Sequence, residues 1–391
     1  MLVIAMLLMM SNMERRLTMN IKNERKLQII ILAVCLIALG ALLLFANHVR
    51  PARLQQSGIY YERGRVTQVI SEMTDADAID PSVGMFLYQL LEVEMLTGEF
   101  QGMRVEVHSN LMSHRLRAFE SGDRVIVQLT DQFIQIQSAD RGMGHFLLVA
   151  VFLLLLCVVG GKRGFFSIIG LVVSLIAILF ILVPLTLAGY SAIFVAIVVG
   201  ILTIITSITL LAGVNAKSIS AIIGCIAGVL VAALFAFIAG EVAFVSGYHL
   251  DESGHLLMFP DLRLAGVFIS GVIISAIGAI SDTSMTIASA MEEVKLANPT
   301  MSMKELAKAG FNVGRDAMGT MSNTLILAFV GSSFGILLLF LSLDINWIAF
   351  INEDLISIEI IQGIAGSIGI VLTVPITTFI AAKLFSLNVN K

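Results

Sequence analysis

The sequence predicts a mainly α-helical membrane protein, with about eight transmembrane helices and a small β-rich, barrel-like domain between the first two. Hydrophobic residues make up 58% of the 391 positions and charged residues only 13%, whereas a soluble domain is nearer half apolar and a quarter charged. Long apolar runs recur along the chain, and basic residues fall in alternate loops. A bilayer accommodates this composition, because lipid takes the place of a polar exterior.

Eight apolar runs reach or approach the roughly 18 residues that a spanning helix needs. The second run is the shortest, and glycines flank it on both sides. The first run stands alone, and the other seven form a predicted bundle over 145–391. The runs cover residues 27–46, 145–160, 165–187, 192–213, 219–240, 264–281, 321–343 and 358–382.

Lys and Arg in the short loops predict that both termini lie in the cytoplasm. Five basic residues between Arg15 and Lys26 precede the first span, in a predicted cytoplasmic segment over 1–26. Counting forward, the loop at Lys162, the loop at Lys217 and the long connection at about 285–318 also lie inside. The short loops on the opposite side carry acidic residues instead.

The segment 47–144 is therefore expected outside the cytoplasm. It alternates apolar and polar residues, for example over Tyr60–Ile70 and Arg124–Leu129, as half-buried strands do. Gly98 and Gly102 punctuate the strands as turns. Five or six short strands predict a small barrel or sandwich, and the pattern leaves both an OB-like and a biotinyl/lipoyl-like topology open.

The sixth span ends in GAISDTSMTIASAMEEV, where Asp282 directly follows an apolar run. An ionisable group at membrane depth is costly and therefore marks a functional hypothesis. In that interpretation Asp282 couples transport to a proton or cation. In the alternative, the helix leaves the membrane here and Asp282 is simply hydrated.

Further polar residues lie at the start of the seventh span. Ser302–Glu305 fits a capping box that begins a helix, which we expect to end at Gly310. Arg315 is either an anchor among lipid headgroups or, with Asn323, a partner of Asp282. The candidate polar transport site comprises Asp282, Arg315, Asp316, Asn323 and Thr324.

Small residues recur at every fourth position of the fifth span, which keeps them on one helix face. Ser220, Gly224 and Gly228 begin this series, and Gly331 and Gly335 repeat the spacing once in the seventh span. Such a face lets a neighbouring helix approach closely. We expect it to serve helix packing, with a substrate path as the alternative.

Several classes of function are disfavoured. The chain has no GxxxxGK[ST] phosphate loop, HExxH motif, GxSxG motif or dinucleotide fingerprint, so we expect no enzyme and no cofactor. The loop from His249 to His255 is expected to hold no metal, because scattered ligands in a hydrated loop bind weakly. A net charge of −4 indicates no nucleic-acid partner. The apolar segment Met1–Met10 is too short to span a membrane, and no basic region precedes it, so we expect no secretory signal there.

The segment SDTSMTIASAMEEVKLANPTMSMKELAKAGFNVGRDAMGTMSNTLILAFVGSS resembles the YibE/F family of bacterial membrane proteins. The resemblance rests on Asp282, Asn298–Pro299, the Glu305–Leu306 helix, Gly314–Arg315–Asp316, Gly319–Thr320 and Asn323–Thr324. It is sharp over about 270–335 and architectural elsewhere. It implies a bacterial plasma membrane and a permease-like role, without a substrate.

Two main hypotheses of function follow. In the first, the chain transports a small solute or ion through the polar constellation around Asp282. In the second, it is a membrane scaffold or assembly protein whose domain at 47–144 binds an envelope protein. An intramembrane hydrolase would rest on Asp282 alone. Under every hypothesis the chain has the lipid bilayer as a partner, and the sequence specifies neither substrate nor oligomeric state.

Overall fold

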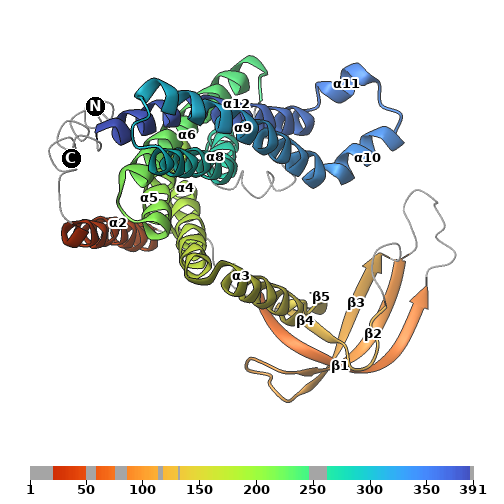
Figure 1. Cartoon of the computed structure of the whole chain (residues 1–391). Coiled ribbons are helices and arrows are strands. Elements are labelled where there is room, and N and C mark those ends of the chain that lie inside the picture. The colour runs from red at the N-terminus through yellow and green to blue at the C-terminus, as the bar shows by residue number, and fades with distance from the viewer. Residues whose placement is uncertain are drawn as a thin grey trace. The chain divides into compact units, whose positions relative to one another are not determined.

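The structure is a computed structural model that describes residues 21–49, 59–74, 86–112, 118–130, 133–245 and 262–387. The predicted metal-free loop His249–His255 and the segment Met1–Met10 lie outside these residues. The chain divides into two compact units, one over residues 52–158 and one formed by the rest. The first holds the strands and the second holds most of the helices, and each is described by itself (Figure 1).

The strands form a closed five-stranded barrel in the order β1-β2-β3-β5-β4. All neighbours pair antiparallel except β3 and β5, which are parallel. This order with a single parallel pair is the topology of the OB-fold, so the biotinyl/lipoyl-like alternative does not apply. The strands are β1 (Ile59–Thr74), β2 (Phe86–Met95), β3 (Arg104–Met112), β4 (Arg124–Thr130) and β5 (Ile134–Ala139).

Alternation along the strands fills the barrel with aliphatic side chains, such as Val66, Leu91 and Val127, all fully buried. One polar group joins them. The amide of Gln89 accepts a hydrogen bond from the backbone N–H of Phe119 at 3.0 Å and donates one to its carbonyl oxygen at 3.2 Å. Because both halves of the amide are paired, burial of Gln89 costs little.

The helices of the chain include long apolar elements, as the sequence predicts. Within the described residues, six candidate spans are long and apolar enough to cross a membrane, and a bent pair of helices adds a seventh. The helices are α2 (Ile21–Val49), α3 (Gly142–Ala177), η2 (Ile178–Leu182), α4 (Val183–Leu187), α5 (Ala192–Ala212), α6 (Ala216–Val242), α8 (Leu264–Ala297), α9 (Met303–Ser332), α10 (Phe334–Ser342), α11 (Trp347–Ile351) and α12 (Asp354–Leu387).

The candidate span Gly142–Leu187 covers two of the predicted spans. It has 46 residues and would measure about 69 Å as a straight helix, more than twice the roughly 30 Å of a hydrocarbon core. Gly161 interrupts the helix with φ 54° and ψ −133°, a conformation that glycine adopts easily. The break falls between the predicted spans 145–160 and 165–187, so the eight predicted spans all correspond to observed helices.

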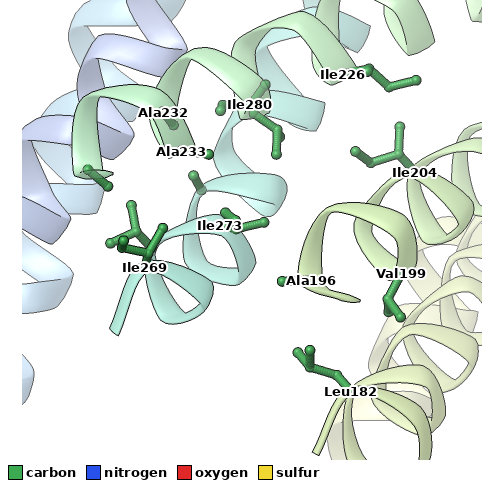
Figure 2. Close-up of a cluster of buried hydrophobic side chains, with 14 of the residues drawn as sticks. Leu182, Ala196, Val199, Ile204, Ile226, Ala232, Ala233, Ile269, Ile273 and Ile280 are labelled. Carbon is green, nitrogen blue, oxygen red and sulfur yellow. The ribbon is translucent and has the colours of Figure 1, made fainter. Parts of the chain in front are cut away.

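Four helices form the centre of the helical unit. α12 packs on α6, α8 and α9, while α8 also contacts α5, α6 and α9, and Figure 1 shows these helices side by side. Their interior is aliphatic. Figure 2 shows Ala196 of α5, Ala233 of α6 and Ile273 of α8 gathered into one cluster. Burial of such surface in a bilayer interior depends on close packing, because lipid is as apolar as the side chains.

The connection predicted at 285–318 is mostly helical. α8 continues to Ala297 and α9 begins at Met303. Ser302 and Glu305 form the predicted capping box, and the Ser302 hydroxyl and backbone N–H hold the pKa of Glu305 below its usual range. The expectation that Gly310 ends this helix is wrong. The helix continues because Gly310 serves as a packing surface, against Met291 and Thr378.

Candidate functional site

Asp282 lies in the second half of α8, inside a candidate span. The opposite side of the helix, with Ile273, Ile280 and Ile287, is fully buried among neighbouring helices. Asp282 follows Ile280 by two residues and therefore points about 200° away from it. Its side chain is exposed on the surface of the helical unit, as is Gly278 one turn earlier.

The other four members of the predicted polar site lie on α9, and all four are exposed. Arg315 and Asp316 directly follow Gly314, which is buried against Val374 and Ile287. Thr324 donates a hydrogen bond from its hydroxyl to the carbonyl oxygen of Thr320 at 2.9 Å. That bond satisfies the Thr324 hydroxyl within its own helix, as a threonine in lipid needs.

The structure brings α8 and α9 together but does not join their polar side chains. The helices run antiparallel, since Gly310 packs on Met291 and Gly314 packs on Ile287. Continued along the helices, this register puts Asp282 level with Gly319. In the part of the chain that the structure describes, no hydrogen bond or ion pair links Asp282 to Arg315, Asp316 or Asn323. Their joint role in transport stays a prediction.

The small residues of α6 meet α12 directly. A Cβ atom at Gly224 would collide with the hydroxyl of Thr377, and one at Gly228 would collide with that of Thr373. Gly228 also lies against Gly369, whose carbonyl oxygen would be 3.0 Å from the added atom. Glycine at these positions lets the two backbones approach closely, which is the packing role expected for the series.

Gly331 and Gly335 behave differently. Both are exposed, and nothing lies within 4 Å of a Cβ atom built on either. They flank Ser333, where α9 ends and α10 begins at an angle of 55°. In this structure the pair accompanies a break in the span rather than a helix contact.

Hydroxyl groups line the contact between α6, α8 and α12. Thr373 donates to the carbonyl oxygen of Gly224 at 3.4 Å, and Thr377 donates to the hydroxyl of Ser284 at 3.5 Å. At the end of this contact Lys217 of α6 forms an ion pair of 2.6 Å with Glu292 of α8. The ion pair fixes the start of α6 beside the end of α8.

A group of polar atoms between α9 and α12 escaped the sequence analysis. Seven buried side-chain oxygens have no hydrogen-bond partner among the described residues, and five of them lie on these two helices or at the break after α9. Such atoms are rare in folded proteins and need an explanation. They belong to Ser322, Ser333, Glu359, Ser367 and Thr378.

A sequence pattern for this group exists in hindsight. Glu359 precedes Gly363 by four residues and Gly366 by seven, so it shares their helix face. Gly331–Ser332–Ser333 interrupts an apolar run with three small residues. Neither pattern shows that the two places face each other, since that depends on the register of α9 against α12.

Comparison with known proteins supplies the family. The sequence model of the family described as YibE/F-like protein matches residues 148–387, which is more than half of the chain. The chain belongs to the YibE/F-like family. No curated protein and no solved structure matches it.

The YibE/F-like match covers the helical bundle from within α3 to the end of α12, including every residue of the predicted polar site. The barrel strands precede it. The chain is thus a multi-pass membrane protein whose family-defining part is the bundle. Among the described residues of this YibE/F-like chain, no group of three His, Cys, Asp or Glu side chains could hold a metal ion.

Proposed function

We propose that this YibE/F-like protein is a permease-like transporter of a small solute or ion. The observation that carries the proposal is Asp282, an ionisable side chain within a span that has no hydrogen-bond or ion-pair partner among the described residues. A carboxylate exposed to lipid is costly, so this position favours access to water during transport. The broken span at Ser333 adds support, since transporter sites are often built on interrupted helices.

The proposal includes a bacterial plasma membrane with both termini in the cytoplasm. Lys217 at the start of α6, Lys295 near the end of α8 and Lys383 near the end of α12 fall at one end of the bundle, because α6 runs antiparallel to α8 and α12. Basic residues favour the cytoplasmic side. The barrel would then lie outside, and no catalytic step is part of the proposed function.

Flux through proteoliposomes tests the proposal. Purified protein is reconstituted into vesicles, and flux is measured in turn for protons, monovalent cations, magnesium, phosphate and small organic solutes. We expect Asp282→Asn to lower the flux by about tenfold or more, which corresponds to about 1.4 kcal/mol, and Arg315→Ala to lower it too. Asp344→Asn is the matched control, since Asp344 is exposed in a turn between α10 and α11, and it should leave the flux unchanged.

Flux no higher than in protein-free vesicles for every member of the panel would refute transport. Equal flux in wild type and Asp282→Asn would refute the role of Asp282. All three variants must elute from size exclusion as wild type does, so that a loss of flux is not a loss of fold.

A second function is favoured by the barrel. Tyr60 and Tyr61 at the start of β1 are 63% and 55% exposed, and exposed aromatic residues are common at protein interfaces. In this alternative the barrel binds an envelope protein and the bundle is its anchor. Cross-linking in intact cells from Tyr60, replaced by a photoreactive residue, should then capture one defined partner. Recovery of no partner would count against the scaffold function.

A further inference from the structure

A polar seam runs between α9 and α12, and its best-defined part lies at the end of the bundle where α12 begins. Contacts fix the register of these two helices. Gly314 packs on Val374, Leu325 packs on Gly366, and Phe329 packs on Gly363. Residue numbers rise along α9 as they fall along α12, so the helices are antiparallel.

This register places Glu359 and Ser333 together. Glu359 lies one turn before Gly363, and Ser333 lies one turn after Phe329, so both continue the contact between Phe329 and Gly363 by one turn. The Ser333 side chain is 4% exposed, and its hydroxyl has no hydrogen-bond partner. Glu359 likewise buries Oε2 without a partner.

The seam continues toward the middle of the bundle. Ser367 directly follows Gly366, and Ser322 lies three residues before Leu325, the side chain that packs on Gly366. The hydroxyls of Ser367 and Ser322 are also buried without hydrogen bonds. Two levels of unpaired oxygen atoms therefore face the same contact between α9 and α12.

The chemistry of these groups suits a cation. Every unpaired atom is an oxygen, the atom type that hard cations prefer. α9 ends at Ser332, so the negative end of its helix dipole points at the same place. Ends of interrupted helices coordinate Na⁺ in other membrane proteins. Arg263, the basic residue at the start of α8, is exposed and forms no ion pair with Glu359 among the described residues.

We propose that Glu359 and Ser333 form a binding site for a monovalent metal cation of the Na⁺ class at the break between α9 and α10. Ser367 and Ser322 lie two or more turns further along the seam, about 12 Å or more from this site, and are not ligands of the same ion. As a coupling-ion site it rests on the transport function proposed above, whereas binding itself requires no flux.

Equilibrium binding tests the site. Purified full-length protein in detergent is titrated with radioactive sodium at constant pH and ionic strength, with choline as the inert replacement. We expect saturable binding of one ion per chain. Replacing a residue that only supports a metal ligand typically weakens affinity about 10- to 100-fold. Glu359 is proposed as a direct ligand, so Glu359→Gln should raise the dissociation constant by at least about tenfold. Ser333→Ala should raise it less.

Glu353→Gln is the matched control, because it makes the same chemical change six positions earlier, before α12 begins, and it should bind as wild type does. The thermal midpoint provides an independent readout. It should rise with NaCl but not with choline chloride in the wild type, because a ligand that binds only the folded state stabilises it, and this rise should be lost in Glu359→Gln. Should Glu359→Gln not fold, Ser333→Ala decides the question.

Absence of saturable sodium binding in the wild type would overturn the proposal. Equal weakening by Glu353→Gln and Glu359→Gln would do the same, because the effect would then be one of surface charge. A midpoint that does not depend on the cation, with a pH dependence that Glu359→Gln removes, would identify Glu359 as a protonated carboxyl and would also overturn the proposal. Binding without flux would refute transport and leave the cation site standing.

Discussion

Adding one methyl group to Gly228 should weaken the contact between α6 and α12. The new Cβ atom in Gly228→Ala would collide with the hydroxyl of Thr373 and lie 3.0 Å from both the Gly369 carbonyl oxygen and Cγ2 of Ile280. Thr373 has little room to turn, since it is fully buried. The carbonyl oxygen belongs to the backbone of α12, so the two helices must separate to admit the methyl group.

The size of the effect follows from two opposing terms. Overpacking of a well-packed interior costs about 1–3 kcal/mol, while alanine in place of glycine within a helix gains about 0.5–1 kcal/mol. Gly278→Ala is the matched control, because it lies inside α8 with nothing within 4 Å of the added Cβ atom. The difference between the two variants removes the helix term and leaves the packing cost of about 1–3 kcal/mol.

Thermal unfolding of the purified full-length protein in detergent measures this difference. At about 2–4 °C per kcal/mol for large domains, Gly228→Ala should unfold about 2–12 °C below Gly278→Ala. Gly228→Ala combined with Thr373→Ala should recover part of the loss, since the closest contact is removed. A midpoint of Gly228→Ala at or above that of Gly278→Ala would refute the close approach of the helices.

Three further predictions concern other parts of the chain. Gln89→Leu should leave two backbone groups unpaired in the barrel and cost about 2–4 kcal/mol, visible as faster hydrogen exchange in β2; unchanged exchange would contradict the burial of that amide. The lowered pKa of Glu305 means that its carboxylate stabilises the capping box above its unfolded pKa and that this stability is lost as pH falls through the folded pKa. The protection of the amides at the start of α9, taken relative to their intrinsic exchange rate at each pH, should therefore fall on acidification in wild type, and Ser302→Ala should abolish this fall. Gly161→Ala should lower the thermal midpoint, because φ 54° costs an L-residue about 1–2 kcal/mol, whereas Gly160→Ala should not; equal midpoints would argue against the break.

The membrane helices and the strands could be predicted because each is a local property of the chain. The alternation in Tyr60–Ile70 reflects one face of a strand, and the observed β1 contains that segment. The closed barrel order depends on pairing between distant strands, such as His108 with Gln135. Periodicity alone therefore left two topologies open, and the structure decided between them.

Long-range register also explains what was missed at the candidate sites. Gly310 is a helix breaker by propensity, yet it lies within α9 because Met291 and Thr378 occupy the space beside it. Glu359 is inconspicuous in the sequence, since an acidic residue near the start of a helix is common. Its interest arises only from Ser333, which comes to the same level through the antiparallel packing of α9 and α12.

The fit of Thr373 and Thr377 into the glycine positions of α6 also constrains how the bundle can move. Each threonine side chain fills the space beside one glycine of α6, so α6 cannot slide along α12 unless the two helices first separate. The Lys217–Glu292 ion pair also connects α8 to α6. These three helices should therefore move together as one rigid unit, and the bend at Ser333 lies outside it.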